Sequence, residues 1–315
     1  MQTPQEDKGV VLIGGEDSDH ARISSVEVMG FNDCSIPNLP EWRINHGSFL
    51  TESGSLAVCG GQWLGKPKSS DCLVLNVASK IWERGQLGDL LGDSVYGVIS
   101  MDDGTYMIHH DSSSFLPTGE RNWVAGPIPR EKVQCATRTS SISFLAFSTS
   151  LARQFDSSDG PSSDEGWSKD GVWPKLEVER YRPGCATILD LCVVAGGLDK
   201  DYVEQLRSVE VIYLSSKARG SAKDMLNPRS HFNLIAVGNT LLAFGGNDDN
   251  SAEIWEGEGG DWEARDLANT RSHFSALAVT DSVCVDGQVP PQSCPTVDGG
   301  SCVFPFKNGK QNAML

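Results

Sequence analysis

A unit of 42 to 49 residues recurs along this chain, and its two clearest copies lie within residues 189–274. Each copy has an Arg-x-His segment, an apolar run that ends in two glycines, a polar turn and a strand of Val-x-Val type. The RSHF segments that begin at Arg229 and Arg271 are 42 residues apart, and the double glycines that begin at Gly196 and Gly245 are 49 apart. Self-similarity at such a period predicts a propeller or a solenoid.

The same features recur upstream, in VVLIGG at residues 10–15 and LAVCGG at residues 56–61. They resemble kelch repeats, which carry a double glycine after an apolar strand and aromatic residues further along, and which build β-propellers. The resemblance covers nearly all of residues 9–285, strongly in four units and weakly in two. Glycine suits a sharp turn with positive φ or a close backbone approach. The repeat glycines are Gly14, Gly15, Gly60, Gly61, Gly196, Gly197, Gly245 and Gly246.

Two of the units depart from the pattern. In the third, His109 and His110 stand at the double-glycine positions, which implies a different local turn. In the fourth, the glycines are missing and Trp173 is expected to supply the outermost strand. Residues 157–171 are rich in Ser, Asp and Gly, so we expect a mobile surface loop there.

The apolar runs of the units number six, at residues 10–15, 56–61, 104–110, 142–148, 191–197 and 241–246. Segment 271–279 is a further inner strand with no blade of its own, and the first unit lacks one. The sequence therefore predicts an all-β, six-bladed propeller over residues 1–285, closed by the C-terminal strand. Closure removes exposed sheet edges, so deleting residues 270–285 should open the ring and cause aggregation.

Composition limits the partners. The formal net charge is −16, which disfavours nucleic acid and anionic membrane surfaces. No apolar run reaches the 18 residues or so of a membrane span, so we expect no membrane insertion. We also expect the propeller to be a monomer. The N-terminal residues have no apolar signal-peptide region. The protein is then either extracellular, with its leader outside this chain, or cytoplasmic.

The chain has nine cysteines, a number that favours secretion. Cys59 ends one strand of its blade and Cys72 begins the next, and the two strands are antiparallel neighbours. The pair can therefore approach to the roughly 5.5 Å Cα separation of a disulfide. The alternative is two buried thiols that act as small apolar side chains.

Composition changes after residue 285. Residues 286–300 form a Pro/Gly-rich linker, and residues 301–315 contain Cys-Val-Phe-Pro-Phe from Cys302. This pentapeptide resembles the opening of a fibronectin type II module, which is extracellular. The resemblance covers about ten residues and implies a truncated module, so we expect 286–315 to be poorly ordered, Cys302 to lack its native partner, and gelatin binding to be absent. The alternative is a disordered tail.

For the histidines and the acidic loops, a catalytic or metal-binding role has weaker support than a structural role. His46, His231 and His273 lie on expected inner strands and together are a possible zinc set, but a structural polar role is favoured. The loops at 17–19, 199–201 and 247–250 offer oxygen ligands for calcium, but Asx hydrogen bonds in solvated turns are favoured. No catalytic motif appears, so we assign no catalytic residue, no metal and no cofactor.

In a four-stranded blade, the loops between the second and third strands emerge on the same side as the connections between blades. We expect partner contacts on this loop face, with the arginines tied mainly to loop carbonyls or carboxylates. The candidate residues there are Asp17, Asp19, Arg43, Arg182, Asp199, Asp201, Arg229, Asp248, Asp249 and Arg271.

The favoured function is a non-catalytic interaction module of a secreted or cell-surface protein that binds a protein or glycan. One alternative is a secreted enzyme, either carbohydrate-active or similar to galactose oxidase, a copper enzyme on a kelch-like propeller. This chain has five tyrosines, none in a recognisable copper-ligand pattern. The second alternative is a cytosolic kelch adaptor.

Overall fold

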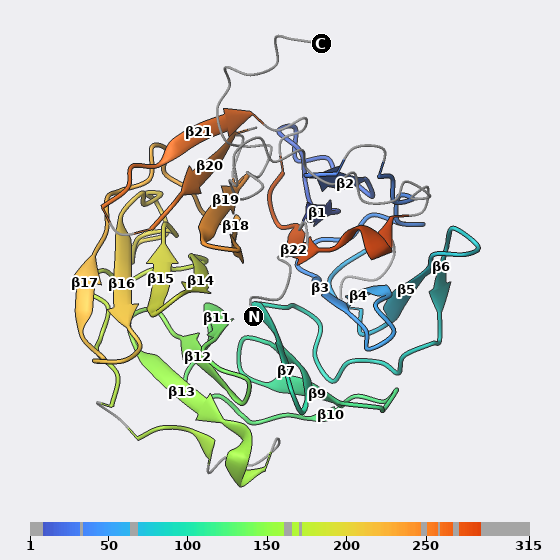
Figure 1. The fold of residues 1–315 in the computed structure, drawn as a ribbon, viewed down its shortest axis with the longest axis horizontal. Coiled ribbons are helices and arrows are strands. Elements are labelled where there is room, and N and C mark those ends of the chain that lie inside the picture. The colour runs from blue at the N-terminus through green and yellow to red at the C-terminus, as the bar shows by residue number, and fades with distance from the viewer. Residues whose placement is uncertain are drawn as a thin grey trace, which may run out of the picture.

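Six β-sheets surround a central channel in the computed structural model (Figure 1). The structure describes residues 9–31, 34–63, 69–160, 166–169, 172–246, 251–257, 259–266 and 271–284. Each sheet is one blade, and its strands are antiparallel neighbours from the channel outward. The expected six-bladed, all-β propeller is confirmed.

The strands of each blade run from the channel to the rim in the following order. Blade one has β22 (Ser275–Val279), β1 (Gly9–Ile13) and β2 (Val26–Met29). Blade two has β3 (Gly47–Leu50), β4 (Leu56–Cys59), β5 (Cys72–Asn76) and β6 (Ile81–Arg84). Blade three has β7 (Gly97–Met101), β8 (Gly104–Ile108), β9 (Ser113–Pro117) and β10 (Val124–Ala125).

Blade four has three strands, β11 (Cys135–Arg138), β12 (Ser143–Phe147) and β13 (Ala152–Asp156). Blade five has β14 (Gly184–Ile188), β15 (Leu191–Ala195), β16 (Val209–Tyr213) and β17 (Arg219–Ser221). Blade six has β18 (Asn233–Val237), β19 (Thr240–Phe244), β20 (Ser251–Trp255) and β21 (Glu263–Asp266). The chain also has 3₁₀ turns at Ser157–Asp159 and Asp281–Val283.

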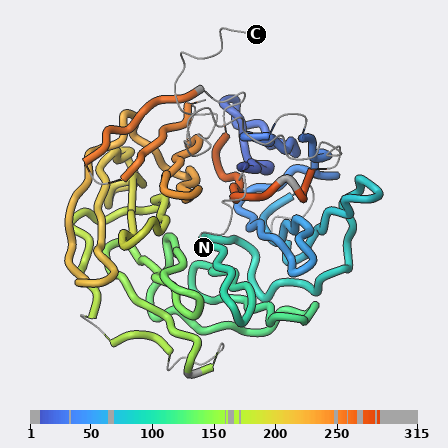
Figure 2. The backbone as a smooth tube through the Cα atoms, in the orientation of Figure 1, coloured from blue at the N-terminus to red at the C-terminus, as the bar shows by residue number. Residues whose placement is uncertain are grey.

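The ring closes as the sequence predicts. β22 pairs antiparallel with β1, with Val11 opposite Leu277, and so supplies the inner strand of blade one. Figure 2 shows this red C-terminal segment beside the blue N-terminal one. A disulfide between Cys34 and Cys284, 250 residues apart, crosses the same closure.

The second strand of each blade is mostly apolar and almost completely buried because both of its faces are covered. Val10, Val58 and Val193, for example, are fully buried. One face packs on the preceding blade and the other on the next, so continuous apolar runs replace the alternation of a half-exposed strand. The core is therefore a series of clusters between neighbouring blades.

The outer positions of blades one and four depart from the four-stranded pattern, and the outer strand expected at Trp173 is wrong. In blade one, residues 34–39 form no strand; instead the Leu39 amide donates to the Ser24 carbonyl at 2.9 Å and Pro37 accepts from the Trp82 indole at 2.9 Å. In blade four the outer position is taken by Trp167, which bridges Phe155 and is buried.

Trp173 instead packs with Leu176 and Cys192 in the cluster between blades four and five. The expectation of a mobile loop fails where residues 166–169 pack against β13; residues 161–165, 170 and 171 lie outside the described residues. Because Trp167 covers the outer edge of β13, Trp173 is not needed there and instead fills the gap between blades four and five.

Three disulfides connect six of the cysteines. Cys59 and Cys72, which face each other across β4 and β5, are joined as expected, with Cα atoms 4.1 Å apart. Cys135–Cys185 links the inner strands of blades four and five. Cys192 is a buried free thiol, and burial raises its pKa to about 12. Cys294, Cys302 and the whole of 286–315 lie outside the described residues.

No helix in the described ranges is both long and apolar enough to span a membrane.

Candidate binding site at the channel mouth

Three of the predicted arginines are buried anchors within their blades. The guanidinium of Arg229 donates to the Gly245 carbonyl at 2.6 Å and to the Glu253 carboxylate at 2.9 Å. Arg43 and Arg271 make the corresponding bonds to the carbonyls of Gly60 and Gly14, at 2.9 and 2.8 Å. Their ties to loop carbonyls and carboxylates confirm the expected structural role.

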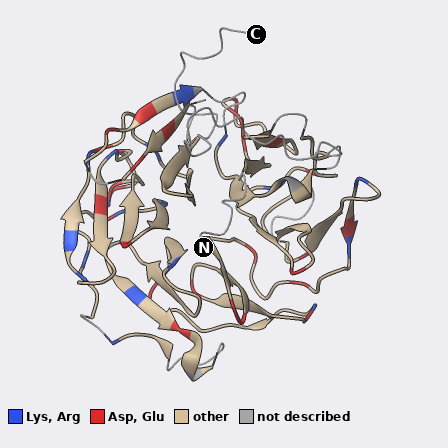
Figure 3. Cartoon of the chain, viewed as in Figure 1, with Lys and Arg blue, Asp and Glu red and all other residues tan. Residues whose placement is uncertain are grey.

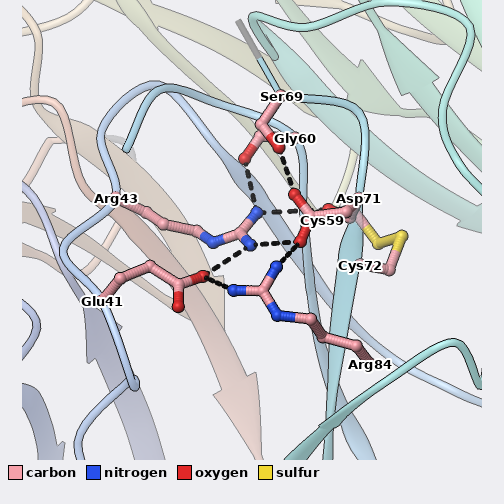
Figure 4. A network of polar contacts seen from close by, with 8 residues as sticks. All are labelled: Glu41, Arg43, Cys59, Gly60, Ser69, Asp71, Cys72 and Arg84. Carbon is pink, nitrogen blue, oxygen red and sulfur yellow. Dashed lines mark hydrogen bonds and ion pairs between the residues drawn. A yellow bond between two sulfur atoms is a disulfide. The ribbon is translucent and has the colours of Figure 1, made fainter. Parts of the chain in front are cut away.

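Figure 4 shows how the Arg43 anchor is elaborated in blade two. Arg43 donates to Glu41 and Asp71, each at 2.9 Å, and Arg84 bonds to the same two carboxylates. The guanidiniums of Arg43 and Arg84, together with the Ser69 hydroxyl, hold the pKa of Asp71 below its usual value, against the opposing effect of burial. Because Arg43, Arg229 and Arg271 are fully buried, their side chains are not available to a partner.

The fourth anchor is Arg180, not Arg182. Arg180 is fully buried and donates to the Gly196 carbonyl at 3.0 Å and to Glu210 at 3.0 Å. Each anchor lies four residues before its inner strand, and β14 begins at Gly184. The sequence interpretation chose Arg182 because two arginines lie two residues apart; the four-residue spacing to the strand identifies Arg180.

Blades three and four fill the anchor position differently, which the sequence interpretation missed. In blade four the charges are exchanged: Glu131 stands four residues before β11, and Arg153 on β13 donates to both its carboxylate oxygens at 2.6 Å. In blade three, Asp93 occupies the arginine position and the His109 ring fills the space. That ring lies 3.0 Å from the Ser94 carbonyl and 2.9 Å from the Ser114 hydroxyl.

The double glycines join each blade to the next. The amides of Gly15 and Gly246 donate to the carbonyls of Arg43 and Arg271, each at 2.8 Å. Both glycines have positive φ, and a Cβ on Gly14 would lie 2.7 Å from the Arg43 carbonyl oxygen. In blade three, His109 and His110 lack the positive φ, which confirms the expected difference in the turn.

One residue per blade forms a rim around the channel on the loop face. This rim residue lies two positions after each anchor, and in four blades it has positive φ. Backbone hydrogen bonds run from rim residue to rim residue: the His231 amide donates to Arg182, His273 to His231, and Asn45 to His273. The rim residues are Asn45, Val95, Val133, Arg182, His231 and His273.

The channel inside this rim has a volume of about 880 Å³. Its wall consists of the six inner strands, and Arg138 at the end of β11 is their single charged residue (Figure 3). Arg138 lies at the end formed by the turns between first and second strands, whereas Arg182 lies at the loop-face mouth. The two mouths therefore have different chemistry.

Arg182 is held by aromatic rings rather than by acids. Its guanidinium lies 4.0 Å from the centre of the Tyr96 ring, and its amide donates to the Gln134 side chain at 3.2 Å. Burial lowers the pKa of Arg182, and the tyrosine hydroxyls of Tyr96 and Tyr202 oppose that shift. No carboxylate of the described residues forms an ion pair with it, in contrast to the four anchors.

The rings of His231 and His273 contact each other at the mouth at a tilt of 35°, with ring centres 4.2 Å apart. Burial, His273 and Arg182 lower the pKa of His231 to about 3. Burial also lowers the pKa of His273, although Glu16, whose carboxylate lies 3.6 Å from the ring, partly opposes this. Both rings are therefore neutral at neutral pH, and each presents one donor and one acceptor nitrogen.

The zinc set suggested by the sequence is not assembled. His46 is the residue after the rim position Asn45, and its buried ring lies beside Gly14, between blades one and two. No group of three or more His, Cys, Asp or Glu residues in the described part of the chain has a metal-binding arrangement.

The acidic loops form the Asx turns that the sequence favours. Asp199 accepts from the amides of Val203 and Glu204, at 2.9 and 3.1 Å. Asp17 accepts from the amides of Asp19 and Ala21, at 3.0 and 2.9 Å. The side chains of Asp19 and Asp201 are exposed, and Asp248 and Asp249 lie outside the described residues.

The aromatic side chains around Arg182 were not predicted. Tyr96 stacks on His110 with ring centres 5.3 Å apart, and the rings of Tyr181 and Tyr202 contact each other at a tilt, with centres 4.0 Å apart. A second hollow of about 600 Å³, lined by Ser70, Asp93 and His110 among others, shares Tyr96 with the channel. The only sequence signal was that Tyr96, Tyr181 and Tyr202 all fall within connections of the loop face.

No protein-family model matches this chain, and no curated protein matches its sequence.

Proposed function

We propose that the protein is a non-catalytic interaction module that binds a protein or glycan partner through its loop face. The observation that carries this proposal is the meeting of two hollows with Arg182, His231 and His273 on that face. A concave site with a few convergent polar groups is the usual form of a ligand-binding site.

Exposed apolar side chains add contact area around the hollows. Tyr202 and Val203, on the loop between β15 and β16, are 60% and 77% exposed. Leu91, Ile128 and Leu226, on connections between blades, are also exposed. Aromatic and apolar side chains at loop tips are suited to partner contacts.

We place the protein outside the cell. The three disulfides, one between two inner strands, one within blade two and one across the ring closure, hint at an oxidising compartment. The repeat pattern supports an extracellular protein of kelch type, and the pentapeptide at Cys302 supports a secreted parent protein.

The test is binding to an immobilised panel of glycans and extracellular proteins, with matched variants on the two faces of blade five. Val203→Ser changes the loop face, and Leu189→Asn changes the opposite face, where Leu189 is 76% exposed. We expect Val203→Ser to weaken binding and Leu189→Asn to leave it intact. The reverse result, no binding to any panel member, or stoichiometric copper in the purified protein would contradict the proposal.

A further inference from the structure

Arg182 differs from the four anchor arginines in the chemistry of its partners. Each anchor binds a glycine carbonyl and has a carboxylate within 3.5 Å, as Arg229 does with Glu253. Arg182 lines the channel mouth, where its guanidinium lies over the Tyr96 ring and its backbone bonds to the neighbouring rim residue His231. A guanidinium that is partly desolvated and lacks an acid provides a strong site for a carboxylate, which it can bind through two parallel hydrogen bonds.

The neighbours of Arg182 on the rim add both hydrogen-bond donors and hydrogen-bond acceptors. The Nδ1 atoms of His231 and His273 lie 3.2 Å from the hydroxyls of Ser230 and Ser272. Asn45 adds an amide on the far side of His273. Neutral imidazoles and an amide both donate and accept, so this arc suits hydroxyl groups next to a carboxylate.

The size and surroundings of the mouth favour a sugar. A channel of about 880 Å³ lies in the range of roughly 300–1,000 Å³ for small-ligand sites. The adjoining hollow, with serine hydroxyls and His110, offers room for a second polar ring beyond Tyr96. Tyr202, exposed beside Tyr181, offers an aromatic face for the apolar side of a sugar.

The net charge limits the ligand to a single acidic group at the mouth. The chain carries −16, and Asp19, Asp199 and Asp201 lie on the loops of the same face. Their field opposes a second anion close to the first. A polysulfated chain or an acidic peptide is therefore disfavoured relative to one carboxylate on a neutral frame.

We propose that the loop-face mouth of the channel binds a uronic acid residue of a glycan, with its carboxylate on Arg182 and its hydroxyls on His231, His273 and Asn45. This inference rests on the proposed function, because it names the ligand class of the same face.

The test is calorimetric or NMR titration of the whole chain with glucuronic acid, glucose, acetate and inorganic phosphate. The key variant is Arg182→Asn, which gives blade five the residue that blade two already has at this position, Asn45, with a similar φ of 54°. Arg138→Gln, in the same channel at the opposite mouth, is the matched control. Thermal melting of each variant shows that it is folded.

We expect glucuronic acid to bind at least tenfold more tightly than glucose, since charged hydrogen bonds contribute about 1.5–3 kcal/mol. It should also bind more tightly than acetate, which has no hydroxyl groups for His231, His273 and Asn45. Arg182→Asn should weaken this binding by roughly ten- to a hundredfold, and Arg138→Gln should not change it. His231→Asn with His273→Asn should reduce the preference for glucuronic acid over acetate.

Equal affinity for glucose and glucuronic acid, or an unchanged affinity in a folded Arg182→Asn variant, would overturn the inference. Phosphate binding as tight as glucuronic acid would show a general anion site instead. If none of these ligands binds while panel partners still depend on Val203, the ligand class is wrong and the proposed function stands.

Discussion

Glu131 and Arg153 form in blade four the ion pair that Arg229 and Glu253 form in blade six, with the two charges exchanged. In each blade one partner lies four residues before the inner strand and the other lies on the third strand. The geometry of the repeat therefore accommodates an ion pair at this place with either order of charges.

The exchange makes a testable prediction for blade four. Arg153→Glu alone should place two acids together and reduce the free energy of unfolding by about 2–3 kcal/mol. This is less than the roughly 3–5 kcal/mol of a fully buried pair, because Glu131 is partly exposed. Adding Glu131→Arg should recover at least half of the loss in denaturant unfolding. A double variant no more stable than the single one would contradict this account.

A second prediction concerns the fully buried anchors. Arg229→Gln should destabilise the propeller by about 3–5 kcal/mol, since it leaves Glu253, which is fully buried, without its countercharge. Arg207→Gln is the control because Arg207 is 61% exposed, and its effect should stay within about 0.5 kcal/mol. Similar losses in both variants would argue against the anchoring role.

The disulfide at the closure should contribute more stability than the one within blade two. Cys34–Cys284 spans 250 residues and Cys59–Cys72 spans 13. Cross-linking a longer loop removes more entropy from the unfolded chain, which corresponds to about 5 kcal/mol against about 3 kcal/mol. Replacing each pair by serine and comparing unfolding free energies tests the order; a larger loss for the shorter loop would contradict it.

Acid should destabilise the propeller through its buried histidines. Burial, with a smaller effect of Arg43, lowers the pKa of His46 to about 3. Between pH 6.5 and about 3 the unfolded chain therefore binds a proton that the folded chain does not, so stability falls as pH falls. The loss from this one group approaches about 1.4 kcal/mol per pH unit.

His46→Leu should make that fall less steep, as measured by urea unfolding at several pH values between 7 and about 4. His20→Gln, at an exposed position on the loop face, is the control and should change the pH dependence less than His46→Leu does. A His46→Leu variant with the same pH dependence as the parent chain would show that His46 is not protonated on unfolding.

Much of the fold could be predicted from the sequence because the repeat leaves a local signature. The double glycines at Gly14 and Gly245 mark where blades touch, and the unpaired segment at Arg271 marks the closure. Each signal follows from a backbone constraint that few other residues satisfy. The Cys59–Cys72 disulfide was predictable for a similar reason, since the two strands are joined by one loop.

The site could be predicted less well because it depends on contacts between distant blades. Nothing local distinguishes Arg182 from Arg180 except the spacing to Gly184, and nothing in the sequence brings Tyr96 to Arg182. The charge exchange at Glu131 leaves no signal in the arginine pattern, because blade four keeps the ion pair but places its arginine, Arg153, on the third strand. The Cys34–Cys284 link joins residues that only ring closure makes neighbours.

Hydrogen exchange of the propeller, with and without the strongest binder from the glycan and protein panel, tests the binding face most directly. Amides that gain protection should lie in the loop at residues 199–206 and in the connections that carry Tyr96 and Arg182. The turns on the opposite face, at residues 139–142 and 189–190, should exchange at unchanged rates. Protection confined to those opposite turns would contradict the account.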